Sequence, residues 1–137
     1  MSLRSALIIL AAAAIAGGCA AQGSRFERVY TPPDSSVIYV YRPYNFGGSL
    51  IRPAVTCGGE TARIAPGAYH AYIVPMGPVT CSAATHTIDE VSVPPHSRVY
   101  YIKEQIGWGP LIGNPHLEPM DADSAQIEIQ TCCVEQP

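Results

Sequence analysis

The chain of 137 residues has little charge and no long apolar run, and each shortage argues against a class of function. Charged residues make up only 14% of the chain, and they form no basic cluster of the kind that binds the phosphates of nucleic acids. The apolar run at residues 6–16 is eleven residues long, whereas a helix needs about twenty to span a bilayer. Neither nucleic-acid binding nor a membrane-spanning helix is therefore expected.

Motifs of the common enzyme classes are also missing. The sequence has no GxSxG, no HExxH and no Gly-rich phosphate loop that leads into a helix. The acidic residues at 89–90 and at 121 and 123 are expected to decorate a loop and to cap a helix. Four histidines are scattered without a metal-binding spacing: His70, His86, His96 and His116. We therefore predict no catalytic residues, no metal and no cofactor.

The N-terminus has the features of an export signal. A short head carrying Arg4 precedes the apolar run, and Gly17 and Gly18 then lead to Cys19. This order is typical of a secretory signal peptide, and a cysteine directly after small residues resembles the lipidation site of bacterial lipoproteins. Ala16 stands where that pattern usually has Leu, and residues 14–16 also fit ordinary cleavage. The alternative is thus a secreted protein with a free Cys19.

Lipidation at Cys19 predicts a location and a domain plan. Removing the signal at residues 1–18 leaves 119 residues with 7 basic and 11 acidic side chains, enough for one domain with a modest core. Residues 19–36 are polar and aperiodic, which predicts a flexible tether, and residues 37–137 form the domain. Ala20 rather than Asp follows the cysteine. We therefore expect an outer-membrane anchor, with several acyl chains including palmitate, that faces the periplasm.

Four cysteines remain after lipidation, and an even number in an exported chain indicates disulfides: Cys57, Cys81, Cys132 and Cys133. A bond between the adjacent pair is disfavoured because their Cα atoms are closer than the usual disulfide range. A Cys57–Cys81 bond is favoured and closes a loop worth roughly 3 kcal/mol. Two alternatives remain for Cys132 and Cys133. They could form disulfides with Cys57 and Cys81, or they could bind a soft metal or exchange with a partner thiol.

Short apolar stretches separated by turn residues predict a mainly β domain. The strands are expected at residues 37–43, 50–57, 61–64, 68–74, 79–85, 88–93 and 97–105. Near-continuous apolarity at 37–43 indicates cover on both faces or an aromatic outer face. Turns every eight to twelve residues favour an antiparallel sandwich or barrel of about seven strands. A short helix is expected after Asp121, which suits an N-cap.

Two loops carry aromatic side chains that could form a binding surface. Trp108 lies in a Gly- and Pro-rich loop at residues 106–119, and Tyr44 and Phe46 lie in the turn at 44–49. Exposed aromatic side chains are common anchors of binding sites. The alternative for Trp108 is a structural one, in which the ring folds back and closes one end of the sandwich.

Several stretches together resemble a family of small bacterial lipoproteins whose domain has no assigned function. The matching stretches are IYVYRP at 38–43, CGG at 57–59, PGAY at 66–69, PMGP at 75–78, RVYYIK at 98–103 and LEPMD at 117–121. The resemblance covers residues 37–131 and implies an immunoglobulin-like or prealbumin-like sandwich. It supplies no catalytic residues.

The sequence thus leads to one functional hypothesis and one alternative. The first is a lipid-anchored, non-catalytic module of the cell envelope that binds a protein or glycan partner. The alternative is a metal- or redox-handling lipoprotein that uses Cys132 and Cys133.

Overall fold

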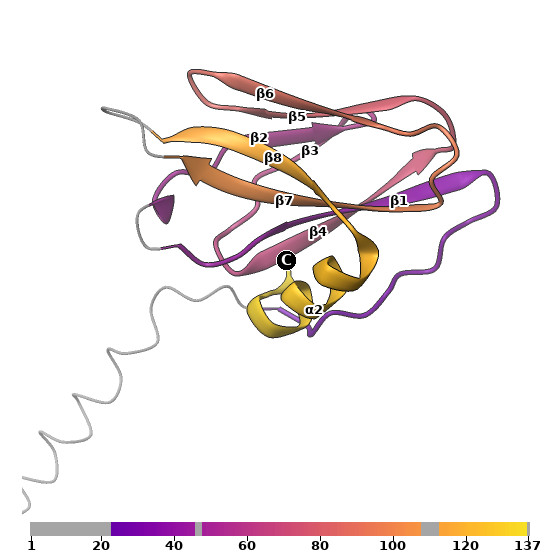
Figure 1. Ribbon diagram of the computed structural model, residues 1–137, viewed down its shortest axis with the longest axis horizontal. Coiled ribbons are helices and arrows are strands. Elements are labelled where there is room, and N and C mark those ends of the chain that lie inside the picture. The colour runs from indigo at the N-terminus through magenta and orange to yellow at the C-terminus, as the bar shows by residue number, and fades with distance from the viewer. Residues whose placement is uncertain (1–22, 46–47, 108–112, 137) are drawn as a thin grey trace, which may run out of the picture.

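The described part of the chain is a two-layer β-sandwich with a helix packed outside it. The computed structural model describes residues 23–45, 48–107 and 113–136. Its strands are β1 (Ser35–Arg42), β2 (Ala54–Cys57), β3 (Glu60–Ala62), β4 (Ala68–Pro75), β5 (Val79–Ala84), β6 (Ile88–Val93), β7 (Val99–Gly107), β8 (Asn114–Met120) and β9 (Val134–Glu135). The helix is α2 (Ala122–Cys132). Figure 1 shows the two sheets stacked, with α2 beneath the larger one. The predicted mainly β sandwich with a C-terminal helix is confirmed.

The two sheets differ in their strand directions. The larger sheet has the order β8-β7-β1-β4-β9, and the smaller sheet has the order β3-β2-β5-β6. All pairs in the smaller sheet are antiparallel. In the larger sheet, β1 pairs in parallel with β7 and β4 pairs in parallel with β9. The prediction of an antiparallel sandwich of about seven strands therefore missed the mixed sheet and two further strands.

Strand β1 is buried on both faces, which explains its continuous apolar sequence. Ile38 and Val40 face the smaller sheet and join the core between the layers. Tyr39 and Tyr41 face the other way, into a second cluster between the larger sheet and α2. The sequence left two alternatives open, cover on both faces or an aromatic outer face. Both hold, because the outer face of β1 is aromatic and is also covered.

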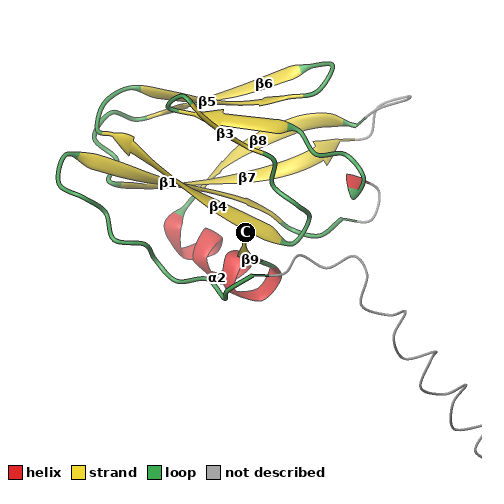
Figure 2. Cartoon of the chain, turned by 180° about the vertical axis from the view of Figure 1, so that it is seen from behind, coloured by secondary structure: helices red, strands yellow, loops and turns green. Residues whose placement is uncertain are grey.

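The segment before β1 lies on the domain from Ser24 onward, whereas a flexible tether was predicted at residues 19–36. Phe26 packs edge-on against the rings of Tyr39 and Tyr69. The backbone N–H of Val29 donates to the Tyr39 hydroxyl at 2.8 Å. Arg25 forms an antiparallel bridge with Val134 of β9. Figure 2 shows this segment running below the same sheet face as α2.

Strand β8 occupies residues that the sequence analysis assigned to a loop because of their prolines. It is an edge strand that pairs only with β7 in its sheet, and Pro115 and Pro119 are opposite Ile106 and Ile102. Leu117 has the same phase as both prolines, and its N–H points away from β7 and donates to Asp89 Oδ2 at 2.7 Å. At this phase the strand needs no N–H toward β7, so proline is tolerated.

Local sequence determines the ends of the helix and of one hairpin. Asp121 is the N-cap of α2, and its Oδ1 accepts from Ser124 N at 2.9 Å, as predicted. These hydrogen bonds to the carboxylate hold the pKa of Asp121 below its ordinary value. Between β2 and β3, Gly58 and Gly59 have φ of 57° and 86°. A two-residue hairpin of this type requires positive φ at both positions, which glycine adopts without strain.

Candidate functional site

The candidate site is a cavity of about 480 Å³ at the end of the sandwich where β1 stops. Pro43 follows Arg42 and has no N–H to continue a ladder, so β1 ends there while β7 runs on to Gly107. The cavity lies between the departing loop and this extension of β7. Its walls are Arg42, Pro43, Tyr44, Asn45, Gly48, Lys103, Glu104, Gln105 and Ile106.

Arg42 is a buried cation whose hydrogen bonds go to the backbone. Its side chain is 3% exposed. Nη1 donates to the carbonyl oxygens of Ile51 at 2.6 Å and Ile64 at 3.2 Å, and Nη2 donates to that of Gly48 at 2.5 Å. Burial lowers the pKa of Arg42, and the nearby Glu104 opposes that effect. The guanidinium thus fastens the loop after β1 to the domain.

Glu104 is a buried carboxylate without a hydrogen bond. It is fully buried, and neither carboxylate oxygen has a partner in the part of the chain that the structure describes. Burial raises the pKa of Glu104 from its ordinary value of 4.5 to about 7, although the charge of Arg42 acts in the opposite direction. An unpartnered buried carboxylate is costly to fold around and is therefore a candidate functional group.

The loop wall of the cavity is held close to β7 and carries an aromatic side chain. A Cβ on Gly48 would lie 2.8 Å from the Ile106 Cβ, so only glycine permits this approach without a shift of the neighbouring side chain. Tyr44, four residues earlier, is 51% exposed. The cavity is therefore bordered by an exposed ring on one wall and by the strand that bears Glu104 on the other.

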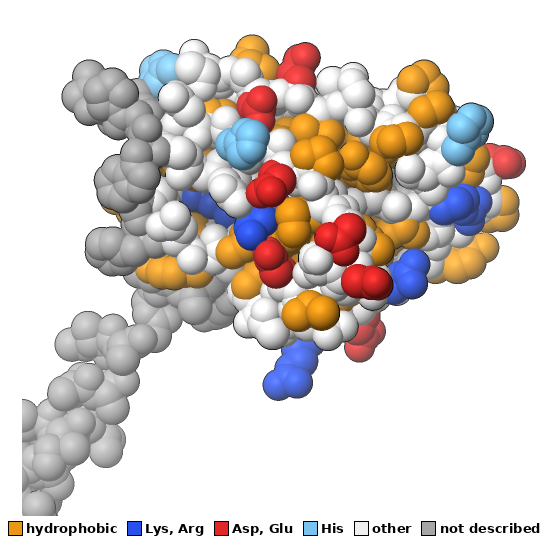
Figure 3. Space-filling view, in the orientation of Figure 1, with side chains coloured by type: hydrophobic (Ala, Val, Ile, Leu, Met, Phe, Trp, Pro, Cys, Tyr) orange, Lys and Arg blue, Asp and Glu red, His pale blue; other side chains and the backbone are white. Residues whose placement is uncertain are grey.

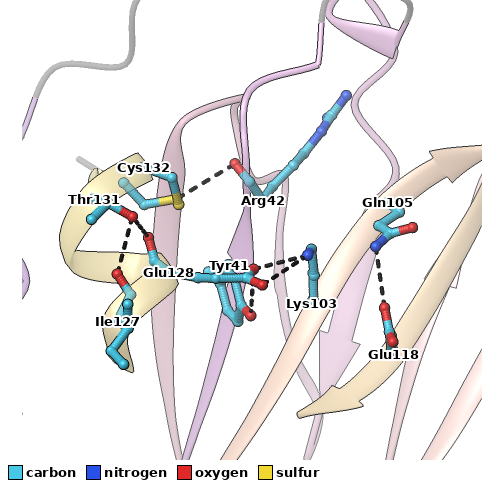
Figure 4. Close-up of polar contacts among 10 residues, drawn as sticks. Tyr41, Arg42, Lys103, Gln105, Glu118, Ile127, Glu128, Thr131 and Cys132 are labelled. Atoms are coloured by element: carbon cyan, nitrogen blue, oxygen red, sulfur yellow. Dashed lines mark hydrogen bonds and ion pairs between the residues drawn. A yellow bond between two sulfur atoms is a disulfide. The ribbon is translucent and has the colours of Figure 1, made fainter. Parts of the chain in front are cut away.

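The charged neighbours on the outer face of the sheet are already paired. Lys103 Nζ lies 2.8 Å from Glu128 Oε2, and Tyr41 donates to the same carboxylate at 3.0 Å (Figure 4). Burial is the main cause that raises the pKa of Tyr41, and the Glu128 carboxylate raises it further. Gln105 Nε2 donates to Glu118 at 3.1 Å. These pairs attach α2 and β8 to β7, whereas Glu104 is a buried ionisable group of the cavity wall that has no partner among the described residues.

Two histidines connect the layers along the flanks of the sandwich. His70 Nε2 of β4 lies 2.7 Å from Glu60 Oε1 of β3. His116 Nδ1 of β8 lies 3.1 Å from Asp89 Oδ2 of β6. His116 therefore belongs to a strand and not to the loop that was predicted at residues 106–119. Because each pair joins one sheet to the other, these four side chains have a structural role.

The four remaining cysteines form two disulfides. Cys57 and Cys81 face each other in the β2–β5 ladder with Cα atoms 4.3 Å apart, which is the pairing that the sequence favoured. Cys132 and Cys133 are bonded to each other at the end of α2, against the expectation that adjacent cysteines avoid pairing. Cys133 is 6% exposed, and its Sγ lies 3.7 Å from the Arg42 carbonyl oxygen. Residues 132–133 therefore close the outer layer and do not reach Cys57 or Cys81.

Of the predicted site residues, Tyr44 lies at the cavity, whereas Phe46, Trp108 and Cys19 lie outside the described residues. The sequence analysis missed Arg42 and Glu104. A signal was present, because Arg42 has the phase of Ile38 and Val40, and Glu104 has the phase of Ile102. A charged residue at the phase of a buried strand face predicts a buried ion.

Four further observations concern the described residues and the relation of the chain to known proteins. Acidic side chains gather on the face that includes β8 and α2 (Figure 3). No helix among the described residues is long and apolar enough to cross a bilayer, and those residues contain no group of three or more His, Cys, Asp or Glu arranged to hold a metal ion. Comparison with models of protein families, with curated proteins and with solved structures found no match.

Proposed function

We propose that this chain is a lipid-anchored module of the bacterial cell envelope that binds a protein or glycan partner and is not an enzyme. It is attached through Cys19 to the outer membrane and faces the periplasm. The observation that carries the binding role is the cavity at the end of β1, bordered by the half-exposed ring of Tyr44. Concave sites with a few polar groups and an aromatic side chain are the usual places for ligands.

The contacts of the N-terminal segment suggest how the anchored domain is oriented. Ser24 O accepts from Glu135 N at 2.8 Å, so the chain is fixed to the edge of the larger sheet five residues after Cys19. Five extended residues span at most about 18 Å. The β9 edge would therefore lie close to the membrane surface. The smaller sheet, on the side of the larger sheet opposite α2, would face away from the membrane (Figure 1).

The anchor is tested by the intact mass and the location of the mature chain. The expected product begins at an acylated Cys19 and fractionates with the outer membrane. Cys19→Ala should move the domain to the soluble fraction, whereas Ala21→Ser should leave it in the membrane. A mature chain that begins at Gly17 with an unmodified thiol would contradict the proposal.

The binding role is tested by photo-crosslinking in intact cells. A photoreactive phenylalanine analogue at position 44 should capture a specific envelope partner. The same group at position 30 is the matched control, because Tyr30 is also an exposed tyrosine, at 77%, and does not line the cavity. Identical products from both positions would argue against a binding site at the cavity.

A second candidate function is metal or redox handling at Cys132 and Cys133, which are bonded to each other at the end of α2. Adjacent thiols released by reduction could bind a soft metal such as Cu(I), or exchange with a partner thiol. This candidate predicts free thiols or stoichiometric copper in the purified protein, with the copper lost in Cys132→Ser and Cys133→Ser. Protein purified from cells that contains no free thiols and no copper would exclude it.

A further inference from the structure

The larger sheet has an open edge along most of β4. On one side, β4 pairs with β1 over its whole length, from Ala68 to Pro75. On the other side, β9 pairs only with Ala68 and Tyr69. The edge from His70 to Pro75 therefore has no strand partner among the described residues. At about 3.3 Å per residue, this open stretch is about 20 Å long.

The register of the sheet shows which backbone groups point to the open edge. Gln136 N donates to Tyr69 O at 2.8 Å, so the carbonyl group of Tyr69 points away from β1 and toward β9. Because these directions alternate along a strand, every second residue of β4 shares this phase. The N–H and C=O groups of Ala71 and Ile73, together with the C=O group of Pro75, therefore point to the open edge.

This edge lacks the usual protection against pairing with another chain. No hydrogen bond joins the backbone of Ala71 or Ile73 to a described residue beyond the edge, and Ile73 is 48% exposed. Proteins commonly protect such an edge with charged side chains, with a bulge or with a covering segment. No Lys, Arg, Asp or Glu lies between Arg63 and Asp89. Pro75 removes a donor only at the end of the strand.

The open edge is complementary to itself. When a two-fold axis relates two such edges, each free N–H meets a C=O group of the same stretch in the other copy. A register centred on Ile73 pairs residues 71–75 with residues 75–71, which uses the open stretch and leaves Tyr69 bonded to Gln136. The absence of charge means that two copies bring no like charges together at this edge.

We propose that two copies of this chain pair through β4 in antiparallel orientation, with Ile73 opposite the Ile73 of the other copy. The two Ile73 residues exchange two backbone hydrogen bonds. Each Ala71 N–H donates to the Pro75 carbonyl oxygen of the other copy. The two larger sheets, of five strands each, thereby join into one continuous sheet.

This pairing goes beyond the proposed function and is compatible with the proposed anchor. The two-fold axis of an antiparallel edge pair is perpendicular to the sheet, so α2 of both copies lies on the same side of the joined sheet. Both N-terminal segments could then reach one membrane surface. Anchoring would also raise the effective concentration of each copy for the other. The pairing itself does not depend on the anchor.

Disulfide trapping in intact cells treated with a mild oxidant tests the register. Opposed Cα atoms of a hydrogen-bonded antiparallel pair are about 5.5 Å apart, which suits a disulfide. Ile73→Cys should therefore give a disulfide-linked dimer on a non-reducing gel. Ala71→Cys is the matched control on the same edge, because its counterpart lies about 13 Å away along the strand. Ile88→Cys, at an exposed isoleucine of β6, is a control on the other sheet.

The trapping experiment has three informative outcomes. A dimer with Ile73→Cys alone supports the proposed pairing. No dimer with Ile73→Cys, or as much dimer with either control, would overturn it. A disulfide between Ile73→Cys and a different protein would show that another chain occupies the edge, which would also overturn the pairing of two copies.

Sedimentation of the purified full mature chain, with detergent micelles in large excess, needs no added cysteine. The wild type should show an equilibrium between monomer and dimer. Ile73→Lys should weaken the dimer about tenfold or more, because two like charges then meet across the axis. Ile88→Lys, at the other exposed isoleucine, should leave the equilibrium unchanged. A wild-type chain that stays monomeric up to about 1 mM would overturn the inference.

The outcomes separate this inference from the proposed function. A monomeric chain with an acylated Cys19 would overturn the pairing and leave the anchored module intact. A chain that forms the Ile73-centred dimer without acylation at Cys19 would contradict the anchor and support the pairing.

Discussion

The larger sheet separates two buried layers that are built differently. The inner layer, between the sheets, is mostly aliphatic and contains the Cys57–Cys81 disulfide. The outer layer lies between the larger sheet and its cover, which is α2 and the N-terminal segment. It is built on four tyrosines: Tyr39, Tyr41, Tyr69 and Tyr101. All four tyrosines are almost fully buried, so both layers exclude water, but the outer layer is covered by a helix and a segment of chain in place of a second sheet.

Tyrosine suits the outer layer because its ring is apolar while its hydroxyl can bond to the cover. The hydroxyl of Tyr39 accepts from Val29 N in the N-terminal segment, and that of Tyr41 donates to Glu128 on α2. The outer layer is thus held by specific polar contacts to two covering segments. The inner layer depends mostly on close packing. Its polar groups are the Tyr72 hydroxyl, which donates to Val55 O, and the Arg42 and Glu104 side chains at the cavity end.

The largest expected difference between the layers comes from removing one fully buried isoleucine from each. Ile38→Ala in the inner layer should lower the free energy of unfolding by about 3–5 kcal/mol. Two hydrogen-bonded sheets cannot move closer together to fill the space left by the removed side chain. Ile129→Ala should cost about 2–3 kcal/mol, because α2 can shift onto the vacated space. Denaturant unfolding of the full chain gives both values. An equal or reversed order would show that the layers are equally rigid.

The two disulfides should differ in how much they stabilise the fold, because a disulfide acts mainly by constraining the unfolded chain. The Cys57–Cys81 bond has a sequence separation of 24, so replacing both cysteines by alanine should cost about 3 kcal/mol. The Cys132–Cys133 bond constrains almost no loop, and its double alanine variant should cost about 1 kcal/mol or less. Thermal unfolding of both double variants measures the difference. A larger loss at residues 132–133 would mean that this bond stabilises the outer layer in the folded state.

Local patterns predicted much of the fold. Alternation and turn residues located β4 and β6 closely, and the Asp121 cap predicted the start of α2. The parallel β1–β7 pairing was not predictable, because pairing between strands far apart in sequence leaves no local signal. Strand β8 was missed because the tolerance of Pro115 and Pro119 depends on which strand edge their nitrogens face.

The candidate site was predictable only in part. Tyr44 was singled out as an aromatic residue in a turn and lines the cavity, whereas its role in binding stays a prediction. Arg42 and Glu104 fell within the strands predicted at residues 37–43 and 97–105 and were not singled out. Their burial follows from the inward phase of β1 and β7 at the end where the layers separate, which needs the tertiary arrangement.

The inner layer ends in a buried carboxylate, that of Glu104, which has no hydrogen-bond partner among the described residues and therefore lowers stability. The pKa of Glu104 in the folded chain, about 7, lies above its ordinary value of 4.5, so folding favours the protonated form. The contribution of Glu104 to stability is therefore greatest below about pH 4.5 and falls until about pH 7.

The most direct test compares the free energy of unfolding of the wild type and Glu104→Gln from pH 4 to pH 8. Glutamine keeps the shape and carries no charge, so the two proteins should be nearly equal at low pH. At pH 8 the variant should be more stable by up to about 3 kcal/mol. A difference that does not change with pH, or a variant that is less stable at pH 8, would show that Glu104 is already satisfied and would contradict the account.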